Sequence, residues 1–202
     1  MRTYLELANS VIVKNNNRLK SCDKSLTLIG TGRSAFVFRI ESTTKAIKVF
    51  FPGFEHIAKE EAEIYHVLKD IPQFPSVYEH GRNYIVMDYI EGDTLFECLA
   101  NGTLITSGHI QEIDYALSLA SDLGLNPSDI HLRNILIASN GEIKLIDVAR
   151  YRQTKDCKQW SNLKKAHLQL YRKRYFVKKI PKPFLNILAF IYKKGLIPTY
   201  RL

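Results

Sequence analysis

Two short stretches, DIHLRN at residues 129–134 and LIDV at residues 145–148, decide how this sequence is interpreted. Asp129 and Asn134 lie in a loop that opens before a predicted strand, and Asp147 ends the strand that follows. One carboxylate that orients a hydroxyl, one amide oxygen and a second carboxylate form a hard oxygen site, which suits Mg²⁺ and phosphate. Each residue alone is better explained as a cap or a turn residue, but their order and spacing together predict such a site.

A glycine-containing turn lies between two predicted strands upstream of this site. It reads GTGRSAFV at residues 30–37, and Gly30 and Gly32 allow backbone N–H groups to approach a phosphate closely. A plain hairpin turn explains the two glycines as well. A dinucleotide-binding loop is disfavoured, because a strand rather than a helix follows the glycines.

Lys48 stands between apolar residues on the next predicted strand. A lysine on a buried strand needs an anionic partner, such as a phosphate or a carboxylate on a neighbouring helix. On an edge strand it would extend outward into solvent. Glu61 is the preferred partner because it stands seven residues before Leu68, where the apolar face of the next predicted helix ends. Glu60 and Glu63 on the same helix are the other candidate partners, and for any one of the three a solvated acidic face is the alternative.

The hydrophobic pattern predicts strands first and helices later, which indicates an α+β fold in two lobes. Runs of β-branched and aromatic residues are separated by turn residues up to residue 51, and one amphipathic helix precedes two more strands. The chain would cross between the lobes near residues 88–93. The predicted elements are strands over 26–29, 35–40 and 46–51, a helix over 54–69, strands over 76–81 and 84–90, helices over 94–100 and 107–123, strands over 134–138 and 142–146, and a basic helical tail.

Taken together, these motifs resemble the protein-kinase-like superfamily over about residues 26–147. The resemblance implies a bilobal protein-kinase-like fold, with a β-rich N-terminal lobe that holds one helix and a truncated, mostly helical C-terminal lobe. Residues 1–202 would form a single kinase-like domain. The N-terminal lobe would cover about residues 1–88, and the C-terminal lobe about residues 93–202 with a basic helical tail over 150–202.

The resemblance assigns roles to the N-terminal motifs and to the crossing between the lobes. Gly30 and Gly32 would cover the phosphates of ATP, and Lys48 would contact the α- and β-phosphates while it pairs with Glu61. Met87 would stand at the gate of the purine pocket. The hinge backbone that would meet adenine belongs to Asp88, Tyr89 and Ile90.

The C-terminal motifs would carry the chemistry. The resemblance implies that Asp129 is the catalytic base, or at least orients the acceptor hydroxyl. Asn134 and Asp147 would hold the metal ions, and Asn134 and Lys48 would complete the catalytic set with Asp129. ATP and Mg²⁺ are therefore the implied nucleotide and metal.

The sequence departs from typical protein kinases around both motifs. NPS at residues 126–128 stands where typical protein kinases have H-R before the catalytic Asp, and without that Arg, control by activation-loop phosphorylation is not expected. VA at residues 148–149 replaces the F-G that follows the metal-binding Asp. Only 55 residues follow Asp147, too few for a standard activation segment and full helical lobe. This compact build resembles the RIO kinases, the small kinase of the KEOPS complex and short bacterial serine/threonine kinases. There an Asp such as Asp156, with Trp160 beside it, can brace the catalytic loop; an ordinary surface position is the alternative.

The function predicted from these motifs is an ATP- and Mg²⁺-dependent phosphotransferase, acting as a serine/threonine kinase on a protein. One alternative is a small-molecule, sugar or lipid kinase of the same superfamily. It arises because the Asp-x-His pattern of Asp129 and His131 resembles aminoglycoside and sugar phosphotransferases. The other alternative is a pseudokinase binding module that docks on RNA or an anionic membrane through its basic tail.

Charge is distributed unevenly along the 202 residues, whose formal net charge is +9. Residues 150–202 hold 15 Lys and Arg and one acidic residue, a balance of +14, whereas residues 1–149 carry −5. The basic region indicates an anionic partner, such as RNA, a membrane surface or an acidic protein, or else a solvated helix face.

Within the basic region, the apolar stretch over 184–192 would be about 13 Å long as a helix, too short to span roughly 30 Å of hydrocarbon. It would lie on an anionic surface or pack on the body of the protein.

Composition and cysteine usage predict a globular protein of the cytoplasm. Hydrophobic residues make up 46% and charged residues 24%, the balance of a chain that buries a core. Three widely spaced cysteines, Cys22, Cys98 and Cys157, fit neither a disulfide framework nor a closed zinc site. The sequence shows no apolar leader segment at its start and predicts no transmembrane span.

Overall fold

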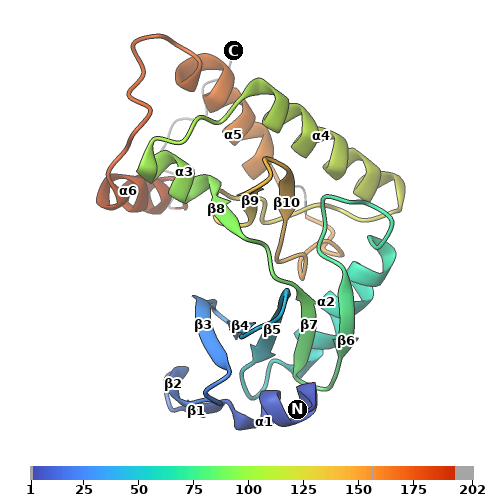
Figure 1. The fold of residues 1–202 in the computed structure, drawn as a ribbon. Coiled ribbons are helices and arrows are strands. Elements are labelled where there is room, and N and C mark those ends of the chain that lie inside the picture. Colours follow the sequence, from blue (N-terminus) through green and yellow to red (C-terminus); the bar gives the residue numbers. More distant parts are fainter. Residues whose placement is uncertain (1, 156, 194–202) are drawn as a thin grey trace.

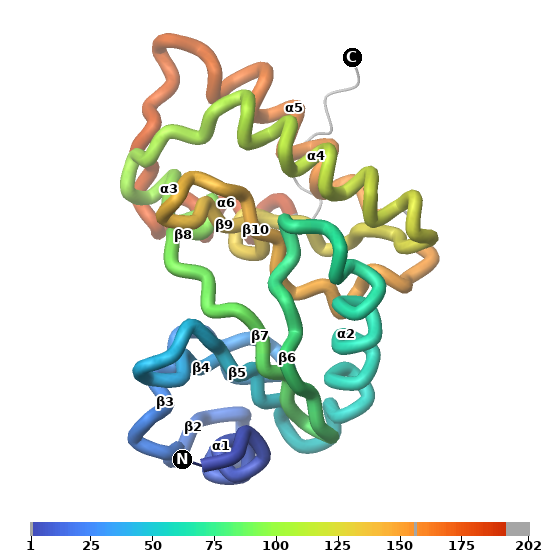
Figure 2. The backbone as a smooth tube through the Cα atoms, turned by 45° about the vertical axis from the view of Figure 1, so that its right-hand side comes forward, coloured from blue at the N-terminus to red at the C-terminus, as the bar shows by residue number. Residues whose placement is uncertain are grey.

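The computed structural model describes residues 2–155 and 157–193 and shows an α+β chain in two lobes (Figure 1). The N-terminal lobe consists mainly of strands and the C-terminal lobe mainly of helices, which confirms the predicted bilobal, kinase-like fold class. In Figures 1 and 2 the chain passes between the lobes as one extended segment, from β7 (Tyr84–Asp88) to β8 (Gly92–Thr94).

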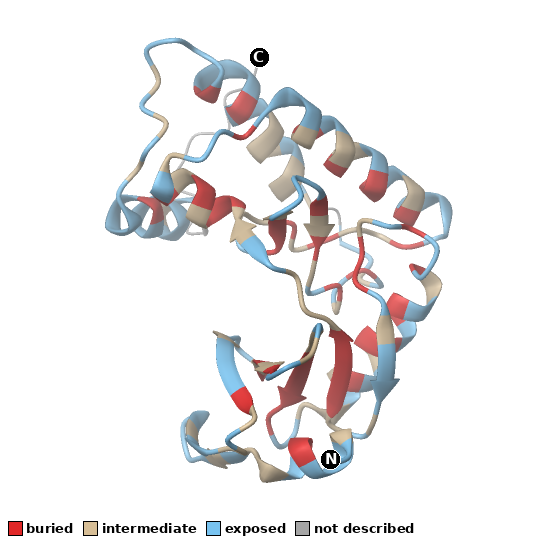
Figure 3. Ribbon diagram, in the orientation of Figure 1, coloured by how far each residue is buried: buried red, intermediate tan, exposed pale blue. Residues whose placement is uncertain are grey.

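A five-stranded antiparallel sheet forms the N-terminal lobe, in the order β3-β4-β5-β7-β6. Alternate side chains of the central strand β5 serve two apolar clusters: Ile47 and Val49 pack with α1, whereas Ala46 and Phe50 pack with α2. Lys48 shares the face of Ala46 and Phe50, so it points toward α2. Figure 3 shows that β5 and β7 are buried along most of their length. The elements are α1 (Tyr4–Ser10), β1 (Ile12–Lys14), β2 (Arg18–Ser21), β3 (Leu26–Thr31), β4 (Ala35–Ile40), β5 (Lys45–Phe50), α2 (Glu55–Val67) and β6 (Val77–His80).

The C-terminal lobe packs its helices around a small sheet with the order β10-β9-β8. Two of these helices, α3 and α4, begin with a capping box, in which the hydroxyls of Thr94 and Thr106 accept hydrogen bonds from backbone N–H groups of the first turn. Gly124, which follows α4, has a φ of +79°, as expected just after a helix end. The elements are α3 (Leu95–Asn101), α4 (Ser107–Asp122), β9 (Ile135–Ala138), β10 (Ile143–Leu145), α5 (Gln159–Ala166), a π-helical turn (His167–Tyr171) and α6 (Lys182–Lys193).

The strands and helices predicted over residues 26–146 are present, with boundaries that differ by a few residues. The sequence pattern does not predict α1, the β1–β2 hairpin or β8. The basic tail is helical only in part, because an irregular segment over 172–181 separates the π-helical turn from α6. Within residues 2–155 and 157–193, no helix is long and apolar enough to cross a membrane.

Candidate active site

The ammonium group of Lys48 joins three elements at the centre of the site. Lys48 Nζ donates hydrogen bonds to both carboxylate oxygens of Glu61 on α2, at 2.8 and 2.7 Å. The same Nζ donates to Oδ1 of Asp147, just after β10, at 2.9 Å. This second contact joins the two lobes directly. Glu63, another of the three candidate partners on α2, lies instead against Arg152, with Arg152 Nη1 2.6 Å from Glu63 Oε2.

Lys48, Glu61 and Asp147 differ in burial, and their charges shift one another's pKa values. The Glu61 side chain is fully buried and that of Lys48 is 11% exposed, whereas 48% of the Asp147 side chain is exposed. Burial acts to lower the pKa of Lys48, but the carboxylates of Glu61 and Asp147 outweigh it and raise this pKa above its ordinary value. The Lys48 ammonium in turn holds the pKa of Asp147 below its usual value. Lys48 and Asp147 are therefore both charged at neutral pH.

Asp129 lies in the loop before β9, with an unusual backbone and cationic neighbours. Its φ of +61° falls in the left-handed region, which is uncommon for a residue other than glycine and costs free energy. Its Oδ2 accepts a hydrogen bond from Arg33 Nη2 at 3.1 Å, and Arg150 Nε lies 3.6 Å from the same oxygen. His131 Nε2 lies 3.9 Å from Oδ1. The Asp129 carboxylate thus faces two guanidinium groups.

Hydrogen bonds that involve both backbone and side-chain groups hold Asn134 and Asp147 beside this loop. Asn134 Nδ2 donates to the carbonyl oxygen of Asp129 at 3.1 Å, and the N–H of Ile146 donates to the carbonyl oxygen of Asn134 at 2.9 Å. Asp147 also has a φ of +61°, and its N–H donates to the hydroxyl oxygen of Tyr65 on α2 at 3.2 Å. These contacts connect the loop, the strand ends and the helix that carries Glu61.

The crossing segment holds the residues expected to meet adenine. Met87 is 6% exposed near the end of β7. The N–H groups of Asp88 and Tyr89 donate to backbone carbonyl oxygens of the N-terminal lobe, at 3.1 and 2.9 Å. Within the part of the chain that the structure describes, the N–H of Ile90 has no hydrogen-bond partner. Ile90 thus offers the first free backbone donor after β7.

Gly30 and Gly32 lie where β3 turns into β4. The N–H of Gly32 donates to the carbonyl oxygen of Ala35 at 2.9 Å. A Cβ atom at Gly30 would lie 3.5 Å from Val37, and one at Gly32 would lie 3.4 Å from the Ala35 oxygen. Both distances are close to ordinary van der Waals contact. Packing within the chain therefore does not demand glycine at either position.

Sequence reasoning missed Arg33, Arg150 and Tyr65, which reach Asp129 or Asp147 from other parts of the fold. Arg33 comes from the turn between β3 and β4, Arg150 from the turn after β10, and Tyr65 from α2. Each stands within four residues of a predicted site residue in the sequence. That proximity was the available signal, but it does not indicate which way a side chain points.

Two expectations for the tail concern Asp156 and Trp160. Asp156, the candidate brace for the catalytic loop, lies outside the described residues. Trp160 Nε1 donates to Oδ1 of Asp114 on α4 at 2.6 Å. Trp160 thus helps to hold α5 against α4.

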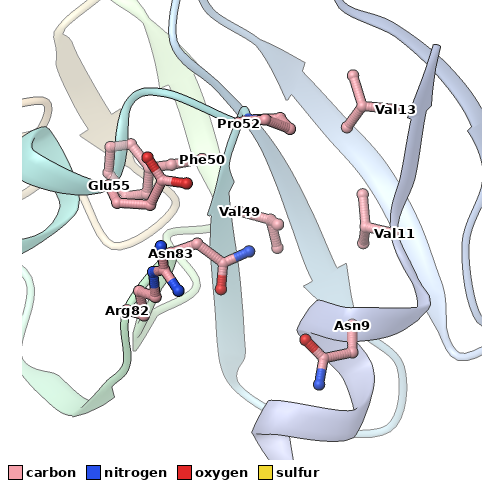
Figure 4. A pocket seen from close by; sticks show the side chains of 9 residues that line it. All are labelled: Asn9, Val11, Val13, Val49, Phe50, Pro52, Glu55, Arg82 and Asn83. Atoms are coloured by element: carbon pink, nitrogen blue, oxygen red, sulfur yellow. The ribbon is translucent and has the colours of Figure 1, made fainter.

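A hollow of about 380 Å³ in the N-terminal lobe contains none of the predicted site residues. Figure 4 shows Val11 and Val13, from the chain around β1, facing Val49 of β5 across this hollow. Its other walls come from α1, the start of α2 and the turn before β7. It therefore belongs to the packing of the N-terminal segment against the sheet, apart from the Lys48 cluster.

Comparison with known proteins finds close similarity to kinases, although no protein-family model matches the chain. The chain is 47% identical to "Putative serine/threonine-protein kinase YrzF" of Bacillus subtilis (strain 168) over 193 residues, 93% of this chain and 90% of that protein. It is 30% identical over 156 residues, 71% of its length, to "Serine/threonine-protein kinase STE20" of Yarrowia lipolytica. It is also 28% identical over 142 residues, 59% of its length, to "Probable serine/threonine-protein kinase PknB" of Lactococcus lactis. These matches cover 14% and 22% of the latter two proteins. The chain therefore belongs to the protein-kinase-like superfamily, as a member of its short bacterial type.

Proposed function

We propose that this chain is an ATP- and Mg²⁺-dependent phosphotransferase that acts as a serine/threonine protein kinase. The observation that carries the proposal is the buried ammonium of Lys48, bonded at once to Glu61 of the N-terminal lobe and Asp147 of the C-terminal lobe. The names of the relatives support the same reaction class, since each is called a serine/threonine-protein kinase.

A nucleoside triphosphate fits the residues around Lys48. The ammonium, oriented by Glu61, offers a fixed positive charge to the α- and β-phosphates. Glycine at positions 30 and 32, which packing does not demand, would let the backbone approach the phosphates. The free N–H of Ile90 suits the edge of an adenine ring, with Met87 behind it.

Mg²⁺ would be held by Asn134 and Asp147, whose amide and carboxylate oxygens are the hard ligands it prefers. Lys48 bonds Oδ1 of Asp147, which leaves Oδ2 for a metal ion. In the described ranges, no group of three or more His, Cys, Asp or Glu side chains is arranged to hold a metal. Phosphate oxygens and water would therefore supply the other ligands. Bound Mg²⁺ would neutralise charge on the transferring phosphate.

Asp129 would orient the acceptor hydroxyl and accept its proton during in-line attack on the γ-phosphorus. The bond from the acceptor oxygen to phosphorus forms as the bond to the β–γ bridging oxygen breaks, and ADP leaves with that electron pair. The side chain of Arg33, which now bonds Asp129, is 68% exposed. Because the guanidinium is open to solvent, an acceptor hydroxyl can take its place beside the Asp129 carboxylate. Catalysis would then rest mainly on positioning.

Transfer of ³²P from labelled ATP to a protein acceptor tests the proposal. We expect Asp147→Ala to abolish transfer and Asp129→Ala to lower it at least about a hundredfold. Asp122→Ala, at the exposed end of α4, is the matched control and should transfer at the parent rate. Equal rates for Asp147→Ala and the parent protein would show that the site is wrongly assigned.

A panel of acceptors separates protein from small-molecule transfer. Labelling of aminoglycosides or sugars without labelling of any protein would contradict the proposed protein acceptor, but it would not contradict the proposed phosphotransferase activity.

We also propose that the protein works in the cytoplasm. Cys22, Cys98 and Cys157 are all unpaired in the structure, as a reducing compartment would keep them.

A further inference from the structure

Helix α6 is attached to the C-terminal lobe along one side. Leu185 is 3% exposed and packs with Phe96 and Ala100 of α3. Next to it, the Asn186 side-chain oxygen accepts a hydrogen bond from Arg133 Nη2 at 2.9 Å. The Arg133 guanidinium also stacks on the ring of Phe96, 3.5 Å from its centre. These contacts fix which side of α6 faces the protein.

The opposite side of α6 is apolar and exposed to solvent. Phe184, Ile187 and Leu188 are spaced three and four residues apart, so they share one face of the helix. They are 69%, 55% and 52% exposed. A surface helix of a globular protein normally turns its apolar stripe toward the core and its polar residues toward water. In α6, Leu185 packs inward, but three further apolar side chains face solvent instead of polar ones.

Basic residues dominate the segment that leads into this apolar face. In Figure 1 the segment over 172–181 runs along the same edge of the C-terminal lobe as α6. The sequence from residue 157 to residue 202 contains no Asp or Glu. Two more apolar side chains of this segment, Tyr175 and Val177, are 81% and 69% exposed. Its exposed basic side chains, together with the first of α6, are Arg172, Lys173, Arg174, Lys179 and Lys182.

We propose that this basic and apolar face, residues 172–191, docks on the surface of an anionic lipid bilayer. A bilayer supplies both chemistries at once: anionic head groups for the lysines and arginines, and hydrocarbon for the aromatic and aliphatic side chains of α6. RNA would match the charge but offers no apolar phase for three exposed side chains of one helix face. The 12 residues of α6 extend about 18 Å, so the helix lies in the plane of the interface and does not cross it.

Vesicle flotation with the full chain tests this docking. The probes are vesicles of phosphatidylcholine alone and of phosphatidylcholine mixed with phosphatidylglycerol. We expect the chain to float with the mixed vesicles, to bind neutral vesicles much more weakly, and to be released as salt rises from about 0.1 M to about 1 M, because salt screens the charges.

Two double variants separate the apolar and the charged contributions. Ile187→Gln with Leu188→Gln should lower the partition coefficient at least about tenfold. Lys179→Ser with Lys182→Ser should lower it about thirtyfold at low salt, at roughly a fivefold effect for each basic residue. The matched control is Leu104→Gln with Tyr115→Gln, which changes side chains that are 58% and 59% exposed elsewhere. It should bind like the parent.

The outcomes that overturn the proposal are distinct from a loss of folding or of activity. Thermal melts must show that each variant unfolds like the parent, since all substituted side chains are exposed. Failure to bind mixed vesicles overturns the proposal, as does equal binding by the Ile187→Gln/Leu188→Gln variant. Binding of an RNA oligonucleotide without vesicle binding would assign the face to RNA. A parent dimer in analytical ultracentrifugation that is lost only in the Ile187→Gln/Leu188→Gln variant would assign the face to a second copy of the chain. Vesicle binding needs no phosphate transfer, so it stands or falls separately from the proposed kinase activity.

Discussion

Replacement of Lys48 by Met is expected to destabilise the fold by about 3–5 kcal/mol at neutral pH, because it leaves a buried charge without a partner. Met keeps most of the length of the lysine side chain but removes the three hydrogen bonds that Nζ donates. Asp147 can regain water because 48% of its side chain is exposed. Glu61 cannot, because its side chain is fully buried. The expected loss is therefore that of one buried, unpaired carboxylate.

The sign of the pH dependence identifies this carboxylate as the cause. Burial raises the pKa of Glu61, and loss of the Lys48 ammonium raises it further. A group whose pKa is higher in the folded state stabilises the fold below its unfolded pKa, and this contribution is lost as pH rises through the folded pKa. The difference in unfolding free energy between Lys48→Met and the parent should thus be smaller near pH 5 than near pH 7.5.

Urea unfolding of four proteins at both pH values measures the effect. The double variant Lys48→Met/Glu61→Met should recover most of the loss, because apolar replacement of both partners removes the unpaired charge. Arg152→Met is the control for an exposed pair: the side chains of Arg152 and Glu63 are 40% and 46% exposed, so its loss of stability should be far smaller than that of Lys48→Met. The reasoning is refuted if Lys48→Met lies within about 1 kcal/mol of the parent, or if its penalty grows toward pH 5.

Two further predictions concern the backbone at β8 and a tyrosine of β7. Gly92→Ala should cost more than about 2 kcal/mol in thermal unfolding, because the new Cβ would lie 2.2 Å from the carbonyl oxygen of Ile137. Gly141 also has a positive φ, but an added Cβ there would meet open space. Gly141→Ala should therefore cost less, about 1 kcal/mol. Equal costs for the two substitutions would contradict the steric argument. Burial and the hydrogen bond to Glu79 raise the pKa of Tyr84 to about 12. NMR titration should show the Tyr84 hydroxyl ionising well above pH 10. The stability that depends on its neutral form should be lost as pH rises toward 12. Ionisation of Tyr84 near pH 10 would contradict the raised pKa.

Local patterns were sufficient to predict most of the fold between residues 26 and 146. Strands rich in β-branched and aromatic residues, and helices whose N-caps are Thr94 and Thr106, carry their signals within a few neighbouring residues. The β8 strand could not be predicted this way, because its three residues form a strand only by pairing with β9. The Thr3–Glu6 capping box of α1, in contrast, was a local signal that could have been used.

Spacing in the sequence nominated residues for the site but left their geometry open. It favoured Glu61 among three glutamates, and the structure places Glu61 against Lys48. It gave no indication that Arg33, 96 residues away in the chain, donates a hydrogen bond to Asp129. A contact of that kind depends on how the two lobes lie against each other, and short-range sequence patterns carry no information about that arrangement.

The sequence alone determined the order of strands and helices, the division of charge between residues 1–149 and 150–202, and the residue types available to a phosphate site. The tertiary structure decided which of these groups meet, and it decided which side of α6 remains exposed. An amphipathic period shows that a helix has an apolar face, but it does not say what covers that face. In α6 the neighbours of Leu185 and Asn186 fix the inner side, and so Phe184, Ile187 and Leu188 face outward.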